Sequence, residues 1–98
     1  MKPELQIKAI AELDGWTLKG TLGHSNYPAF IHNDGRKVAT CNLPHYLTSR
    51  DAIVPVIEKQ PLEVQHDIGE RLQIYHAWKV TAEMYCQALL RATGKWVE

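Results

Sequence analysis

The beginning of the chain shows a periodicity typical of a mostly buried helix. Its charged side chains Glu4, Lys8 and Glu12 recur every four residues and form one narrow polar stripe. Apolar side chains cover most of the remaining circumference: Leu5, Ile7, Ala9, Ile10, Ala11 and Leu13. We therefore predict a helix over residues 3–14, ended by Gly15 and buried on more than one side.

The next part of the chain alternates between apolar and polar side chains, as antiparallel strands do. Short runs at residues 16–19, 29–32 and 36–41 each follow this alternation. The last two runs flank the sequence Asn-Asp-Gly at residues 33–35, and these residue types tolerate the positive φ angles of a tight connection. We predict a three-stranded antiparallel meander that contains a hairpin at this point.

Helical patterns return after the meander. Thr48 or Ser49 suits the cap of a helix that runs to about Lys59, and Asp51 is placed to complete an arrangement like a capping box. A further helix is predicted over residues 61–75, where apolar side chains line one side and acidic ones line the other.

The last part of the chain predicts a short extended piece followed by a helix. Residues 76–80 form the extended piece, Thr81 suits the cap of the final helix, and Gly94 suits its end. The order α-β-β-β-α-α-(β)-α shows no repeat and no linker, so we predict one domain over residues 1–98. Its expected fold class is α+β, with a small, mainly antiparallel sheet of three to four strands flanked by the N- and C-terminal helices.

Composition limits the expected partners and location. The formal net charge is zero, which makes a nucleic-acid partner unlikely because such binders usually carry a basic excess. No apolar run reaches the length of a membrane span, no signal-peptide layout is present, and two cysteines are too few for a secreted disulfide framework, so we expect the cytoplasm. The terminal helices offer more apolar surface than one sheet face covers, which predicts a homo-oligomer.

Motifs of metal-dependent or nucleophilic catalysis are not apparent. His24, His32, Cys41 and His45 are possible zinc ligands, but they lack the paired anchor that zinc sites usually show. The sequence has no G-x-S-x-G elbow, and Cys86 falls on the apolar side of the last helix, where thiols are usually inert. We therefore expect no metal, no cofactor and no enzymatic activity.

Aromatic and basic residues gather in the middle of the chain. Residues 16–50 carry four Lys or Arg side chains against one acidic side chain, together with Trp16, Tyr27 and Tyr46. Stacking faces beside cations suit a nucleotide-sized anion. The candidate ligand-binding residues are Trp16, Arg36, Lys37, His45, Tyr46 and Arg50. The alternative is that the two aromatic rings pack inward and that Arg50 is a solvated charge. Trp78 and Trp96 are expected in the core or in a lid.

Two segments of the chain resemble a known protein family. The run LPHYLTSRDAI from Leu43 to Ile53 resembles the "LPNY-T-s-x-D-A" segment of small phage and prophage proteins, with His45 at the place of the asparagine. The run TAEMYCQALLRATGKW from Thr81 to Trp96 resembles their closing helix, and a Gly-Trp pair likewise follows their first helix. The resemblance is to the phage α/β/α-sandwich (ABA sandwich) domain family. It implies a phage or prophage origin and this layered fold, and it supplies no activity and no catalytic residue.

Two functions are expected on these grounds. The first is a non-catalytic phage accessory protein that binds and sequesters a small anionic ligand, such as a nucleotide immune signal, in the cytoplasm of the host cell. The second is a protein–protein adaptor, or an inhibitor of a host protein. Convergence of the basic and aromatic residues on one cleft would favour the ligand binder, whereas their spread over an apolar face would favour the adaptor.

Overall fold

The computed structural model describes residues 1–21, 28–39 and 43–97. In chain order, its elements are α1 (Pro3–Leu13), β1 (Trp16–Thr21), β2 (Pro28–His32), β3 (Lys37–Ala39), α2 (Arg50–Glu58), α3 (Leu62–Leu72), the 3₁₀ helix η2 (Ala77–Lys79) and α4 (Ala82–Ala92). The strands form one antiparallel sheet in the order β1-β2-β3, which confirms the α+β class and the order of the helices and the first three strands. None of the described helices is both long and apolar enough to span a membrane.

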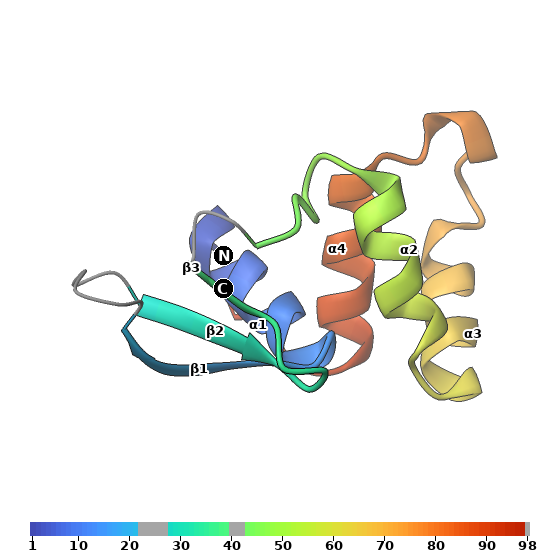
Figure 1. The fold of residues 1–98 in the computed structure, drawn as a ribbon. Coiled ribbons are helices and arrows are strands. Elements are labelled where there is room, and N and C mark those ends of the chain that lie inside the picture. Colours follow the sequence, from blue (N-terminus) through green and yellow to red (C-terminus); the bar gives the residue numbers. More distant parts are fainter. Residues whose placement is uncertain (22–27, 40–42, 98) are drawn as a thin grey trace.

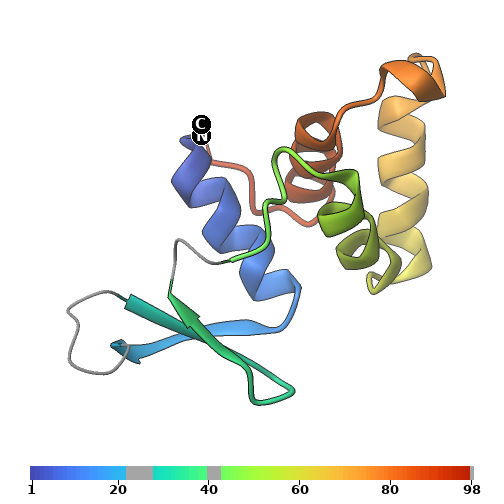
Figure 2. The ribbon, with the colours of Figure 1, turned by 45° about the horizontal axis from the view of Figure 1, so that its top comes forward.

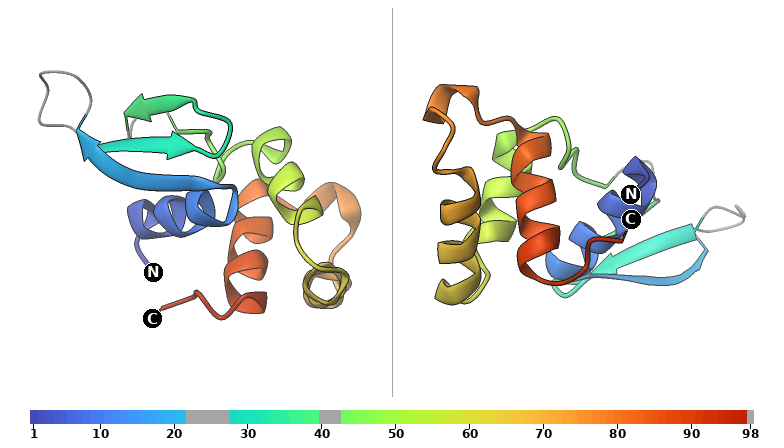
Figure 3. Two further views of the ribbon diagram at one scale, coloured as in Figure 1. Left: turned by 60° about the horizontal axis from the view of Figure 1, so that its bottom comes forward. Right: turned by 180° about the vertical axis from the view of Figure 1, so that it is seen from behind.

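The elements form two groups that meet at α4 (Figure 1). In one group α1 lies along a face of the sheet, and in the other α2, α3 and α4 form a helical bundle (Figure 2). Because α4 contacts α1 as well as α2 and α3, it joins the two groups. The molecule is elongated, at 48 × 25 × 23 Å, and its two ends lie side by side near α1 (Figure 3).

The register of the sheet places its large side chains against α1. Trp16 pairs with His32 across β1 and β2, and Phe30 pairs with Val38 across β2 and β3. Since side chains alternate along a strand, Trp16 and Phe30 share one face, and both are buried in the core. Gly35, at φ 96°, donates its N–H to the His32 carbonyl over 2.9 Å and closes the turn before β3, which confirms the predicted hairpin.

One hydrophobic cluster runs through both groups. Phe30 from the sheet and Tyr46 from the connector before α2 are almost completely inaccessible to solvent. Ile53 of α2 and Leu89 and Leu90 of α4 are equally buried and belong to the same cluster. The connector therefore carries an aromatic side chain from the sheet end of the molecule into the core shared with the bundle.

The segment expected to be extended after α3 has a different structure. Residues 77–79 form the 3₁₀ helix η2 instead of a fourth strand. The N–H of Lys79 donates to the His76 carbonyl over 2.8 Å, and that of Val80 donates to the Ala77 carbonyl over 3.3 Å. These local bonds satisfy backbone groups that a strand would have to pair with a neighbouring strand. The prediction of a strand was therefore wrong here.

Of the two predicted helix caps, the one at α4 forms and the one at α2 does not. At α4, the Thr81 hydroxyl accepts a hydrogen bond from the Met84 N–H at 3.2 Å, which confirms the predicted cap. At α2, Ser49 occupies the cap position but makes no side-chain cap bond. Thr48 directs its hydroxyl back to the His45 carbonyl at 3.5 Å, so the capping arrangement predicted with Asp51 does not form.

A glycine in the middle of α3 provides a test of the helical assignment. Gly69 is exposed, and a Cβ added there would meet no atom within 4 Å. Because glycine disfavours a helix interior by about 1 kcal/mol relative to alanine, Gly69→Ala is expected to raise the free energy of unfolding by ~0.5–1 kcal/mol in a urea melt. The control, Gly35→Ala, should lower it because its positive φ strains a side chain. A Gly69→Ala protein less stable than the parent would contradict the assignment.

Candidate functional site

Three of the six predicted ligand-binding residues come together around one carboxylate. The indole N–H of Trp16 donates to Asp14 Oδ2 over 3.3 Å, and the phenol of Tyr46 donates to the same oxygen over 2.7 Å. The guanidinium of Arg36 lies over the Trp16 ring, 5.2 Å from its centroid. The structure therefore confirms that these aromatic and basic residues are neighbours, while their use by a ligand stays a prediction.

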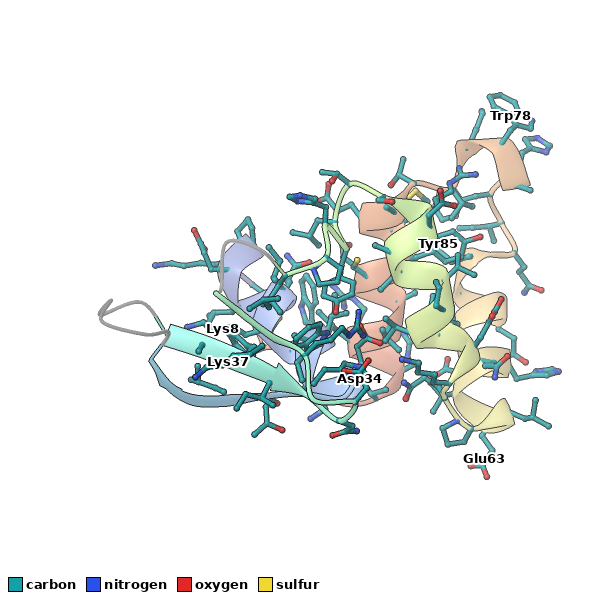
Figure 4. The ribbon with its side chains drawn as sticks, viewed as in Figure 1. Lys8, Asp34, Lys37, Glu63, Trp78 and Tyr85 are labelled. Carbon is teal, nitrogen blue, oxygen red and sulfur yellow. The ribbon has the colours of Figure 1, made fainter. Side chains whose placement is uncertain are left out.

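The other three predicted residues lie elsewhere. Lys37 is exposed on β3, on the side of the molecule away from the bundle (Figure 4), and His45 is exposed on the connector. Arg50 begins α2 and donates a hydrogen bond to the backbone carbonyl of Val80, just before α4. Four open cavities formed by described residues are lined by none of the six predicted residues. In this part of the chain, the six residues do not converge on one cleft.

Burial determines what the two aromatic rings do. Trp16 is 4% exposed and Tyr46 is fully buried, so neither ring presents a face to solvent. Burial, together with the hydrogen bond to Asp14, raises the pKa of Tyr46 well above its usual value. The phenol therefore keeps its proton and serves as a hydrogen-bond donor to the carboxylate.

Asp14 also contacts the end of α2 and strand β2, through its second carboxylate oxygen and its backbone carbonyl. Its Oδ1 forms an ion pair with Lys59 Nζ, at the end of α2, over 2.6 Å. Its backbone carbonyl lies 2.8 Å from His32 Nε2. The N–H of Asp34 donates to His32 Nδ1, and Asp34 Oδ1 lies 3.2 Å from the same nitrogen, so the His32 ring bridges Asp14 and the hairpin. Sequence reasoning missed Asp14, because a residue at a helix end shows no local sign of such distant partners.

The hairpin next to this network has its own charge pair. Asp34 Oδ2 lies 2.7 Å from Arg36 Nε, and its Oδ1 accepts the Arg36 N–H over 3.0 Å. The backbone hydrogen bond is the main cause that lowers the pKa of Asp34, followed by the charge of Arg36. Because the folded-state pKa is lowered, the carboxylate stabilises the hairpin above its ordinary pKa, and this contribution is lost as the pH falls through the lowered value.

The four possible zinc ligands are only partly described. His24 and Cys41 lie outside the described residues, as does Tyr27. Of the other two, His45 is exposed and His32 is engaged with Asp14 and the hairpin. Among the described residues, no group of three or more histidine, cysteine, aspartate or glutamate side chains is placed to hold a metal ion.

Exposed apolar side chains gather at the far end of the bundle, in a segment that we call the aromatic tip (residues 74–79). Trp78 is 75% exposed and Ile74 is 79% exposed, and Tyr75 between them is 45% exposed. The Trp78 side chain points away from the body of the molecule (Figure 4). The expectation that Trp78 lies in the core or in a lid was wrong, because η2 carries it beyond the reach of the bundle.

The exposed Trp78 ring is nevertheless held in place. The His76 ring stacks on it with centroids 5.8 Å apart and planes 6° apart. Lys79 Nζ lies 5.0 Å from the centroid of the same ring. The tip thus presents an aromatic surface with a positive charge beside it.

Comparison of the chain with protein-family models, with curated proteins and with solved structures finds no match. The resemblance to the phage ABA-sandwich family therefore stays a prediction based on the two quoted segments.

The reactivity of Cys86 of α4 tests whether its thiol is buried in the native protein. It is fully buried, its thiol donates to the Tyr46 carbonyl over 3.1 Å, and burial raises its pKa to about 12. In a Cys41→Ser background, a thiol reagent at about pH 8 should therefore label Cys86 only as fast as the protein opens. Labelling should accelerate in urea. Rapid labelling of the native protein would contradict the burial of this thiol.

Proposed function

We propose that the protein is a non-catalytic adaptor that binds a partner protein through the aromatic tip. The observation that carries the proposal is the exposure of Trp78, together with that of Ile74 and Tyr75 in the same short segment of the chain. Large apolar side chains gathered at one exposed place are typical of interaction sites, and tryptophan and tyrosine contribute most to binding energy at protein interfaces.

The exposed apolar side chains of the tip can contribute binding energy when a partner covers them. Burial of one large apolar side chain contributes about 1.5–3 kcal/mol, so Trp78, Ile74 and Tyr75 together offer several kcal/mol to a partner. Part of every association energy is lost when mobile side chains become ordered. Stacking with His76 and the contact with Lys79 favour one orientation of the Trp78 ring and so reduce this loss.

The backbone of the tip is also fixed at its end. Val80, which follows η2, is 4% exposed and packs into the molecule. Its carbonyl accepts the hydrogen bond from Arg50 of α2. In this proposal Arg50 therefore positions the tip and is not a ligand for an anion.

Charge indicates the chemistry of the partner. Residues 71–82 include Arg71, His76 and Lys79 and contain no acidic residue. The partner surface that complements this segment is apolar and acidic, such as an amphipathic helix with carboxylates at its rim. If the chain is phage-encoded, as the resemblance implies, the partner would be a protein of the bacterial host.

The alternative function, the sequestration of a small anionic ligand at the six predicted residues, has less support. Trp16 and Tyr46 would have to leave the core before they could stack on a ligand. Arg50, in turn, would have to leave the Val80 carbonyl.

Site-specific photo-crosslinking tests the adaptor proposal. The amino acid p-benzoylphenylalanine is introduced at position 78 or, as a matched control, in place of Leu18, which is 51% exposed on β1. We expect one discrete crosslinked protein from position 78 in bacterial cells and none from position 18. Lys79→Glu should weaken the crosslink at least ten-fold, because it reverses the charge beside Trp78.

Two results would count against the adaptor. One is the same set of crosslinked bands from positions 18 and 78, which would mean that the contacts are non-specific. The other is a crosslink at position 78 that Lys79→Glu leaves unchanged, which would exclude an acidic partner surface. Thermal melts of each variant establish that the fold is intact.

A further inference from the structure

Two arginines, Arg71 and Arg91, line a groove between α3 and α4. Arg71 comes from the last turn of α3, and Arg91 comes from the last turn of α4. Tyr75 and Gln87 add a phenol and a carboxamide to the same walls, and Leu72 and Met84 provide apolar surface. None of the seven residues that line this groove carries a carboxylate.

The two guanidinium groups keep donors for a ligand. Arg71 uses its Nε in a 2.9 Å hydrogen bond to Asp67, one turn earlier on the same helix. That bond does not involve its terminal amino groups. Arg91 lies over the Trp96 ring, 4.6 Å from the centroid. Stacking uses the face of a guanidinium, whereas its N–H groups point outward in the plane of the group.

We infer that this groove is a binding site for a small phosphate monoester. Two guanidinium groups on opposite walls suit a phosphate dianion, which offers three acceptor oxygens and accepts paired hydrogen bonds from each arginine. A phosphate dianion also carries twice the charge of a carboxylate and so matches the two guanidinium charges. This inference does not rest on the adaptor proposal, although Arg71 and Tyr75 belong to both surfaces.

The size and lining of the groove define the organic part of the ligand. Its volume of about 290 Å³ is just below the range, roughly 300–1,000 Å³, that small-molecule sites usually occupy. This volume fits one phosphate with a small organic group. Leu72 and Met84 offer a surface on which a flat or aliphatic group packs, while Tyr75 and Gln87 can donate hydrogen bonds to it.

Calorimetric titration with adenosine monophosphate tests the inference, and adenosine is the uncharged control. The parent protein should bind the phosphate ester at least ten-fold more tightly than adenosine, and the binding should weaken as salt is raised. Arg71→Ala and Arg91→Ala should each weaken binding about ten-fold or more. Arg36→Ala, which removes an exposed arginine at the sheet end of the molecule, should leave it unchanged.

Three results of these titrations would contradict the proposed phosphate site. Equal affinities for adenosine and its monophosphate would show that the phosphate is not recognised. Unchanged binding in both Arg71→Ala and Arg91→Ala, or no binding at about 10 mM ligand, would remove the groove as a phosphate site, because two guanidinium groups should capture a dianion in that range. Crosslinking at position 78 is measured separately, so failure of this site leaves the adaptor proposal intact.

Discussion

The carboxylate of Asp14 is the constraint on which the arrangement of the two halves depends. It accepts hydrogen bonds from Trp16 of β1 and from Tyr46 of the connector, and it pairs with Lys59 at the end of α2. The side chain is only 13% exposed, so water competes weakly for these bonds, and each is worth more than a surface contact. One side chain at the end of α1 thus ties the sheet, the connector and the helical bundle together.

This network separates the aromatic residues of the sheet end from those of the bundle end. Trp16 and Tyr46 satisfy the carboxylate and fill the core, and Arg36 covers the Trp16 ring from outside. At the opposite end, η2 places Trp78 in solvent, and α3 and α4 set their arginines along one groove. The sheet end therefore keeps its two large aromatic rings in the core, whereas η2 exposes Trp78 and the bundle carries the groove with two arginines.

Local patterns in the sequence were enough to predict much of the fold. The hairpin at residues 33–35 and the Thr81 cap depend on neighbouring residues only, and both were predicted correctly. The partners of Asp14 were not predictable, because they come from elements far apart in the chain. Trp78 was expected in the core or in a lid because tryptophan is usually buried, and its exposure depends on a 3₁₀ turn that has no clear sequence signal. The periodicity of α3 separates its inner and outer sides but does not reveal which flank meets α4.

A double-mutant cycle tests the role of Asp14 most directly. Asp14→Asn, Tyr46→Phe and the combined variant are unfolded in urea, and the coupling energy is calculated from the three changes in stability. We predict a coupling of about 1–2 kcal/mol, as expected for a buried hydrogen bond to a charged group. The exposed pair Asp67 and Arg71, treated in the same way, should give about 0.3–0.5 kcal/mol. A coupling between Asp14 and Tyr46 no larger than that of this exposed pair would contradict the account.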